Sequence, residues 1–236
     1  MKIGGLQKVT LVDYPGKLAC TVFLSGCNFR CPFCYSKELV LPEEIKNQPE
    51  ISEKIFFEFL NEKKEMLQAC VLCGGEPTIY GNDLVEFIKK IKEKGFLVKL
   101  DTNGTDSEMI KKLIDGNLVD YIAMDIKAPL TKEKYAKASG KEDVDIDKIK
   151  ESVFLIKNSI VDYEFRSTIV PLIHSKEDII QMANDISPAK KHFLLRFRGE
   201  KGTIDKDLES SKPYSDETLK EIEEKIKNDF QVFKIR

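Results

Sequence analysis

Apolar residues follow two alternating patterns along the chain: short continuous runs, and stripes at helical spacing. The runs are typical of buried strands and occupy residues 18–24, 71–73, 96–100, 119–124, 164–170, 193–197 and 232–235. Stripes that mark one face of a helix lie between several of these runs, at Ile51, Ile55, Phe59 and Leu60, then at Leu84, Phe87, Ile88 and Ile91, and then at Met109, Ile110, Leu113 and Ile114. The alternation predicts βαβ units and the parallel sheet of an α/β protein.

Cap signals and weaker patterns add further helices. Asn82-Asp83 is expected to cap the second stripe, and Ser175 with Asp178 has the form of a capping box. Polar helices are expected at residues 146–156 and 216–227. No linker or repeat interrupts residues 1–236, so we expect one domain. The stretch 199–213 is rich in glycine and charge, and we expect it to be a mobile loop.

Composition indicates where the protein is located and which partners it does not attract, but it does not indicate the reaction. The net charge of −2 gives no general attraction to nucleic acid. No early apolar segment and no long apolar span are present, so we expect neither secretion nor membrane insertion. The six cysteines are clustered, which favours reduced, metal-binding thiols over disulfides and predicts a cytoplasmic protein.

Three of these cysteines, Cys27, Cys31 and Cys34, share one short loop directly after the run 18–24. Their spacing, C-x3-C-x2-C, supplies three thiolates, whereas a 4Fe–4S cluster has four irons, so one iron would stay open for a small molecule. A zinc knuckle usually needs a second ligand pair, and buried thiols are not expected in so polar a loop. Both alternatives nevertheless stay open at this point.

The other three cysteines are poor candidates for a fourth cluster ligand. Cys20 lies within the run before the loop and is expected to point into packed surroundings. Cys70 and Cys73 are three residues apart on one expected strand, so their side chains point to opposite faces. Cys73 is therefore expected to face the pocket alone.

A second chemical signal follows Cys73, in the turn Gly74-Gly75-Glu76-Pro77. The glycines allow a ligand to approach the backbone, the carboxylate can accept hydrogen bonds from an amine, and the proline fixes the turn. By itself this is a common turn between a strand and a helix. After the cysteine loop, it predicts a pocket for a ligand that carries an amino group.

Polar residues also follow the later apolar runs. Asp101 and Asp125 each end a run, and the carboxyl ends of parallel strands meet at one face of a barrel. Either residue alone is best interpreted as a helix cap or a loop carboxylate. Lys127 is on the same face as Asp125 if the strand continues, with a solvated lysine as the alternative. Arg166 lies in an otherwise apolar strand and must be paired there, by a ligand carboxylate or by an internal salt bridge.

On these residues the chain resembles the radical S-adenosylmethionine superfamily. Its flanking sequences are similar to those of glycyl-radical-enzyme activating enzymes, and most similar to anaerobic ribonucleoside-triphosphate reductase activating proteins. The similar stretches are Val12-Asp13-Tyr14-Pro15-Gly16-Lys17, Ser25-Gly26-Cys27-Asn28, Asp101-Thr102-Asn103-Gly104 and Met124-Asp125-Ile126-Lys127. The resemblance extends from the N-terminus to about Pro171.

The resemblance implies a fold and a set of cofactors. The fold would be a partial (β/α)6 barrel, similar to a TIM barrel. One 4Fe–4S cluster would be bound by Cys27, Cys31 and Cys34, and its open iron would bind S-adenosylmethionine. The amino group of the cosubstrate would be bound by Gly74, Gly75, Glu76 and Pro77. Its carboxylate would be bound by Lys127 and Arg166. A monovalent cation beside the carboxylate would be held by Asp101, Thr102 and Asp125, with Asn103 beside them.

The resemblance also implies a reaction. Reductive cleavage of S-adenosylmethionine would give a 5′-deoxyadenosyl radical, which would abstract the Cα hydrogen of a glycine in a partner enzyme. The partner would be a glycyl-radical enzyme, anaerobic ribonucleotide reductase in the first place, and a flavodoxin- or ferredoxin-like protein would donate the electron. No nucleic acid, membrane, internal base or nucleophile is needed.

The identity of the partner and the type of reaction both leave alternatives open. Similar activating enzymes usually have His-Asn after the third cluster cysteine, whereas this chain has Tyr35-Ser36, which puts the partner in doubt. A small-molecule radical enzyme such as a 7-carboxy-7-deazaguanine synthase has the same cysteine spacing and a similar glycine turn. A metal-binding regulator without catalytic activity is the other alternative, but it leaves the residues 74–77 unexplained.

Overall fold

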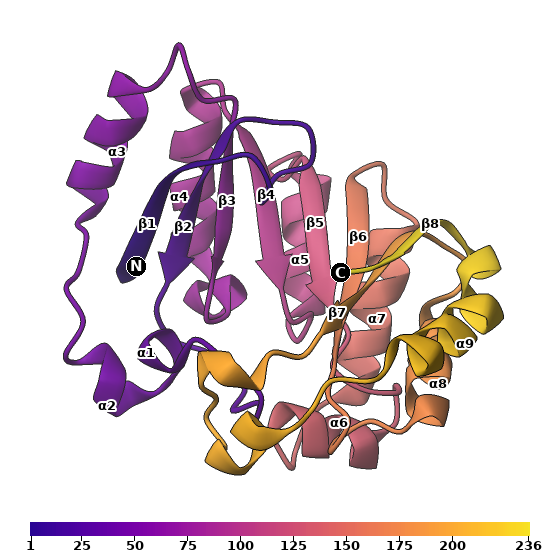
Figure 1. Ribbon diagram of the computed structural model, residues 1–236. Coiled ribbons are helices and arrows are strands. Elements are labelled where there is room, and N and C mark those ends of the chain that lie inside the picture. Colours follow the sequence, from indigo (N-terminus) through magenta and orange to yellow (C-terminus); the bar gives the residue numbers. More distant parts are fainter.

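The computed structural model describes residues 1–236 and contains one curved sheet of eight strands in the order β1 to β8 (Figure 1). The strands are β1 (Ile3–Thr10), β2 (Ala19–Leu24), β3 (Ala69–Gly74), β4 (Leu97–Thr102), β5 (Tyr121–Asp125), β6 (Asp162–Ile169), β7 (Ala189–Arg196) and β8 (Phe230–Ile235). Strands β2 to β8 are parallel, and β1 pairs antiparallel with β2. The sheet does not close, because β1 and β8 are its two edges.

Helices connect the parallel strands and cover one face of the sheet; in Figure 1, α4, α5 and α7 lie behind β3 to β6. The α-helices are α1 (Lys37–Val40), α2 (Pro42–Ile45), α3 (Glu53–Glu62), α4 (Asn82–Glu93), α5 (Ser107–Asp115), α6 (Lys132–Ser139), α7 (Ile146–Lys157), α8 (Lys176–Ile186) and α9 (Asp216–Ile226). Short 3-10 turns are η1 (Pro77–Tyr80), η2 (Gly199–Lys201), η3 (Lys206–Ser210) and η4 (Lys227–Asp229). The α/β class and the open, barrel-like sheet are therefore confirmed.

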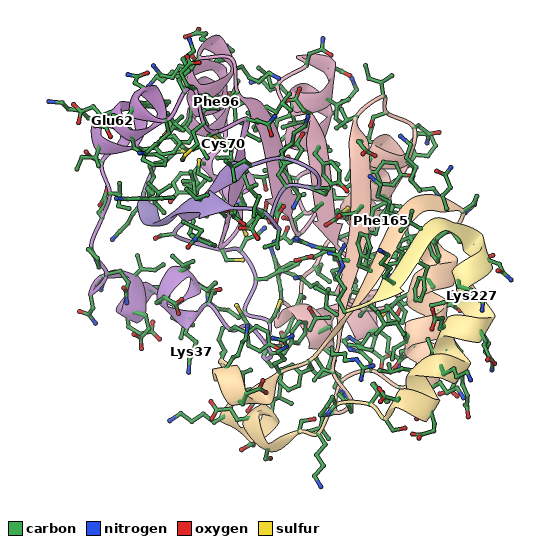
Figure 2. The ribbon with its side chains drawn as sticks, turned by 45° about the horizontal axis from the view of Figure 1, so that its top comes forward. Lys37, Glu62, Cys70, Phe96, Phe165 and Lys227 are labelled. Carbon is green, nitrogen blue, oxygen red and sulfur yellow. The ribbon has the colours of Figure 1, made fainter.

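The main hydrophobic core lies between the sheet and these helices. It includes Cys20 and Cys70, which are register partners on β2 and β3, with their sulfur atoms 3.5 Å apart. Cys70 is labelled in Figure 2 among the side chains on the helix side of β3. Cys73 lines the cavity on the other side of the sheet. The expected opposite orientation of Cys70 and Cys73 is confirmed.

The inner, concave side of the sheet is partly filled from one end. The connection between β1 and β2 brings Tyr14 beside Tyr121 of β5, with ring centroids 5.7 Å apart. Lys99 of β4 donates a hydrogen bond to the backbone oxygen of Asp13 at 2.7 Å. These contacts occupy the amino-terminal end of the half-barrel, so the space that stays open lies at the carboxyl-terminal end.

Several expected elements need correction. Strand β1 was not predicted, because its sequence, IGGLQKVT, has neither a continuous apolar run nor a clear alternation. Ile55 lies on the exposed side of α3, and Ile51 precedes the helix and pairs with Ile3, so the first predicted stripe is wrong at both positions. Phe56 takes the buried place in α3, because a stripe of Phe56, Phe59 and Leu60 faces the core.

Helix boundaries were predicted more accurately where side-chain caps exist. Ser175 and Asp178 form the expected capping box at the start of α8. Helix α4 begins at Asn82 itself, with Gly81 in the capping position, so Asn82-Asp83 is not the cap. The short helices α1, α2 and α6 were not predicted, because they are too short to show a stripe. No helix in the structure has the length and the apolar character that crossing a membrane requires.

Candidate active site

The carboxyl ends of β2 to β6 surround one cavity, at the end of the sheet toward which the arrows of β2 to β5 point in Figure 1. All of the predicted site residues but one line this cavity. They are Cys27, Cys31, Cys34, Gly74, Gly75, Glu76, Asp101, Thr102, Asn103, Asp125, Lys127 and Arg166. Pro77 is the exception, since it begins η1 and is buried behind the turn.

The loop that carries the three cysteines is attached to several other segments. Asn28 donates a hydrogen bond to Thr105 Oγ1 at 2.7 Å and accepts one from Asn103 Nδ2 at 2.8 Å. The backbone N–H of Arg30 donates to the oxygen of Ser139 at the end of α6, at 2.9 Å. These attachments hold an irregular loop in one conformation at the mouth of the cavity.

The three thiols surround the cavity rather than meeting at one point. No three His, Cys, Asp or Glu side chains in the protein converge as a single-ion site requires. All six cysteines are unpaired, and the cavity adds Phe29 and Phe33 around the thiols. Separate thiols around a space suit a cluster, in which each thiolate binds a different iron.

Burial keeps these thiols protonated when no metal is bound. It raises the pKa of Cys27 to about 11 and that of Cys31 to about 12, and it also raises the pKa of Cys34. The positive charge of Lys127 opposes each of these shifts. Such thiols bind tightly only to a group that displaces their protons, as iron does.

The turn after β3 approaches the cysteine loop as closely as two backbones can. Gly75 N–H donates to Leu24 O, and Glu76 N–H donates to Gly26 O, both at 2.8 Å. A Cβ on Gly75 would lie 1.8 Å from Gly26 O, so no other residue fits there. Gly74 has a φ of 118°, which side chains rarely allow. Both glycines are therefore required by the geometry of the cavity wall.

Glu76 is hydrogen-bonded extensively within the protein. Its side chain is fully buried, and Oε1 accepts hydrogen bonds from Thr78 N, Thr78 Oγ1 and Thr102 Oγ1 at 3.1, 2.7 and 2.8 Å. Oε2 accepts one from Asn103 N at 2.6 Å. The carboxylate thus joins the turn after β3 to the end of β4, and only Oε2 has substantial capacity left for an amine.

The carboxylates of Asp101 and Asp125 are both ion-paired within the protein. Arg166 bridges them, through Nη1 to Asp101 Oδ2 and Nε to Asp125 Oδ1, each at 2.9 Å. Lys99 pairs with Asp101 Oδ1 and Lys127 with Asp125 Oδ2, also at 2.9 Å. All four carboxylate oxygens therefore have a cationic partner, and the group of five side chains carries one net positive charge.

The pKa shifts agree with this pairing. Burial would raise the pKa of Asp101 and of Asp125, but Arg166 and the neighbouring lysine outweigh it and hold both pKa values below the ordinary range. Burial likewise opposes the charge of Lys127, yet Asp125 raises the pKa of Lys127 above its usual value. These directions keep Asp101, Asp125 and Lys127 charged at neutral pH.

These contacts describe three of the residues that the sequence suggested. Arg166 forms the internal salt bridge, and its Nη2 has no protein partner and remains free to meet a ligand in the cavity. Lys127 is not a solvated lysine, since it is ion-paired at the cavity wall. The Thr102 hydroxyl donates to Glu76 and accepts from Gly104 N–H, so it is already used within the protein.

Sequence reasoning did not assign Lys99 or Tyr35 to the site. Lys99 is almost fully buried beside Asp101, and its position two residues before Asp101 on the same strand was the available signal. Tyr35 lines the cavity beside Cys34, although no sequence pattern indicated its role. Neither histidine lines the cavity: His174 accepts a hydrogen bond from Val170 N–H, and His192 is buried beside Ser167.

Comparison with known proteins agrees with this geometry. The family model described as the radical SAM superfamily matches residues 21–186. A Methanocaldococcus jannaschii protein, provisionally named a glycyl-radical enzyme activating enzyme, is 34% identical over 83% of this chain and 79% of its own length. The pyruvate formate-lyase-activating enzyme of Clostridium pasteurianum is 26% identical over 96% of this chain and 97% of its own length.

The fold is also similar to solved structures. A radical SAM methyltransferase from Sphaerobacter thermophilus superposes with a TM-score of 0.70, over 97% of this chain and 68% of that one, at 14% identity. At such low identity the superposition supports the fold alone. The family match covers the cysteine loop, the glycine turn and the carboxylate pair together. This chain belongs to the radical SAM superfamily and is a radical SAM enzyme.

Proposed function

We propose that residues 1–236 form a single radical SAM domain that acts as a glycyl-radical-enzyme activating enzyme, with anaerobic ribonucleotide reductase as the first partner to test. The observation that carries the proposal is the joint lining of one cavity by three free thiols, the glycine turn and an ion-paired carboxylate pair. The similarity to named activating enzymes supports the choice of a glycine as the hydrogen donor. The unpaired thiols favour a reducing, cytoplasmic location.

Cys27, Cys31 and Cys34 would hold the 4Fe–4S cluster, which supplies the electron for reductive cleavage of S-adenosylmethionine to a 5′-deoxyadenosyl radical. The electron would come from a flavodoxin- or ferredoxin-like donor. The residues of this chain bind and orient the cosubstrate, keep water out and need not move a proton. Phe29 and Phe33 provide an apolar wall beside the thiols.

The two charged groups of S-adenosylmethionine have complementary partners in the cavity. The backbone around Gly74 and Gly75 and the free capacity of Glu76 Oε2 suit its amino group. Its carboxylate suits the net positive charge of the ion-pair group, through Arg166 Nη2 and Lys127. Asp101 and Asp125 would then act by fixing the position of Arg166 rather than by touching the cosubstrate.

A monovalent cation at Asp101 and Asp125 is the least supported part of the expected cofactor set. Such an ion would have to share oxygens that Lys99, Arg166 and Lys127 already neutralise. The Thr102 hydroxyl is also engaged. We therefore propose that the cosubstrate carboxylate meets the cationic side chains directly.

The first experiment is anaerobic reconstitution with iron and sulfide, followed by reduction in the presence of S-adenosylmethionine. We expect 5′-deoxyadenosine and methionine in equal amounts from the wild type and none from Cys31→Ala. Cys70→Ala is the matched control, because Cys70 is also a buried thiol but lies on the other face of the sheet. A cluster that forms without any cleavage by the wild type would contradict the enzyme assignment.

A second experiment tests the partner. The candidate glycyl-radical enzyme is prepared with deuterated glycine and mixed with the reduced, loaded protein. Deuterium in 5′-deoxyadenosine, with a glycyl radical visible by electron paramagnetic resonance, would support activation. Cleavage without deuterium transfer from any glycyl-radical enzyme would instead favour a small-molecule substrate.

A further inference from the structure

The cysteine loop is fastened to the C-terminal part of the chain by the residue that follows Cys34. The ring of Tyr35 stacks on Phe197, with centroids 5.8 Å apart and an angle of 16° between the planes. The Tyr35 hydroxyl accepts a hydrogen bond from Arg198 N–H at 2.6 Å. Phe197 is itself buried in the main core, so Tyr35 is attached to a rigid point.

A second attachment lies on the other side of Cys34. The backbone N–H of Asp205 donates a hydrogen bond to Pro32 O at 2.9 Å. The two attachments therefore flank Cys34 in the sequence, two residues before it and one residue after it. Both come from the segment 197–205, which runs from the end of β7 into η2 and lies beside α1 in Figure 1.

The segment 197–205, which overlaps the stretch 199–213, has several contacts within that stretch. Gly199 lies so close to Glu209 O that a Cβ would be 2.5 Å from it. Thr203 is fully buried, and its N–H donates to Glu209 Oε1 at 3.3 Å. A loop tied to such a segment is held by the fold and not by its own sequence.

We infer that Tyr35 is a positioning residue that holds the Cys34 thiolate in place for the cluster, through its stack on Phe197 and its hydrogen bond from Arg198. The inference rests on the proposed function for the identity of the bound group. The contacts join residues of this chain alone, so they can be measured in the metal-free protein. Tyr35 is also where this chain differs from the His-Asn expected in similar activating enzymes.

Two substitutions separate the contributions of the ring and the hydroxyl. Tyr35→Phe keeps the stack and removes the acceptor for Arg198 N–H, whereas Tyr35→Ala removes both. Tyr163→Phe is the matched control, because the Tyr163 hydroxyl likewise accepts a backbone N–H, from Lys190 at 3.1 Å, at the opposite end of the sheet. Losing one such hydrogen bond corresponds to about a fivefold change in an opening equilibrium, and losing the aromatic pair corresponds to about fivefold more.

The first measurement is hydrogen–deuterium exchange of the metal-free protein. We expect peptides that cover residues 28–36 and 197–205 to exchange about fivefold faster in Tyr35→Phe, and faster still in Tyr35→Ala. Tyr163→Phe should leave both peptides unchanged. Unchanged exchange in Tyr35→Ala would show that Tyr35 does not hold the cysteine loop, and it would overturn the inference whatever the cofactor is.

The second measurement uses the reconstituted protein and needs no turnover. The rate at which a chelator removes iron should increase in the order wild type, Tyr35→Phe, Tyr35→Ala, with Tyr163→Phe equal to wild type. The cluster's reduction potential and electron paramagnetic resonance spectrum should shift in the same order, which a general loss of stability would not cause. Equal iron release and identical spectra in all four proteins would overturn the inference, whereas a wild type that holds no cluster would overturn the proposed function instead.

Discussion

The Glu76 carboxylate accepts four hydrogen bonds inside the protein, more than any other side chain at the site. Burial raises its pKa, while the donors from Thr78, Asn103 and Thr102 favour the charged form. A side chain in this position connects the turn after β3 with the end of β4. Its contribution to function therefore depends on its charge and on both of its oxygens.

Glu76→Gln tests this dependence. The amide nitrogen would face at least one protein donor, so we expect the free energy of unfolding to fall by about 2 kcal/mol, together with weaker S-adenosylmethionine binding. Urea unfolding and binding calorimetry on the anaerobic protein would measure the two effects. Glu164→Gln is the control: Glu164 is also buried, but it accepts one side-chain bond, from Tyr121, which an amide oxygen can accept as well.

His192 makes stability depend on pH for a different reason. Burial lowers its pKa to about 3, whereas a histidine in the unfolded chain has a pKa of about 6.5. Between these values only the unfolded chain binds the proton, so stability falls as the pH drops below about 6.5. This residue is neutral throughout the physiological range.

The expected loss from this histidine is about 2 kcal/mol between pH 7 and pH 5, from 1.4 kcal/mol per unit below the unfolded pKa. Urea unfolding of the metal-free protein at both pH values would measure it. His192→Gln keeps a hydrogen-bonding partner for Ser167 and removes the titration, so it should reduce the pH dependence. An equal slope in wild type and variant would assign the pH dependence to other groups.

At the scale of elements, the cavity depends on how closely the turn after β3 approaches the loop after β2. Parallel pairing of β2 with β3 brings Leu24 opposite Gly74, and the two backbones continue in contact beyond the strands. The close approach of the two backbones therefore needs both the strand pairing and the two glycines. A change at Gly75 acts on the relative position of two segments and not on a single contact.

Gly75→Ala should separate these segments. The added Cβ overlaps Gly26 O, and relieving such overlap typically costs about 1–3 kcal/mol. We expect lower stability in urea and loss of S-adenosylmethionine binding. Gly5→Ala is the control, because a Cβ there would meet its nearest atom at an ordinary 3.5 Å. Unchanged cosubstrate binding by Gly75→Ala would show that the close approach is dispensable.

The elements also show where sequence patterns succeed. Continuous apolar runs identified β2 to β7, most of whose residues are buried, because buried strands need apolar side chains at nearly every position. The run that identified β8 lies on an edge strand, where only Phe230 is buried. Strand β1 is an edge strand in which six of the eight residues are at least partly exposed, and its sequence carries no such run. Ile55 was misplaced because a stripe of spacing three or four can be drawn through either Ile55 or Phe56, and only packing shows which one faces the sheet.

At the scale of the whole molecule, the charges inside the half-barrel come from three strands. Lys99 and Asp101 lie on β4, Asp125 on β5 and Arg166 on β6, and they meet only because these strands are neighbours in the sheet. With Lys127, which follows β5 and pairs with Asp125, the group is neutralised internally except for one positive charge. That balance predicts how the site responds to added ions.

Replacing potassium and sodium with tetramethylammonium should leave the rate of S-adenosylmethionine cleavage unchanged, since protein cations already occupy all four carboxylate oxygens. Activity assays at constant ionic strength would test this. Arg166→Lys is the complementary variant, because one ammonium cannot bridge both carboxylates as a guanidinium does. A clear requirement for a small monovalent ion in the wild type would restore the cation site that the sequence suggested.

The sequence by itself determined the chemistry that is local in the chain. The cysteine spacing, the glycine turn and the strand–helix alternation each lie within a few residues, so the three thiols, the α/β class and the radical SAM family could be predicted from them. Only the tertiary structure decided which residues Glu76, Arg166, Lys127 and Tyr35 contact. Most of these contacts join residues far apart in the chain, such as Tyr35 and Arg198, and which distant residues meet is set by strand order and packing.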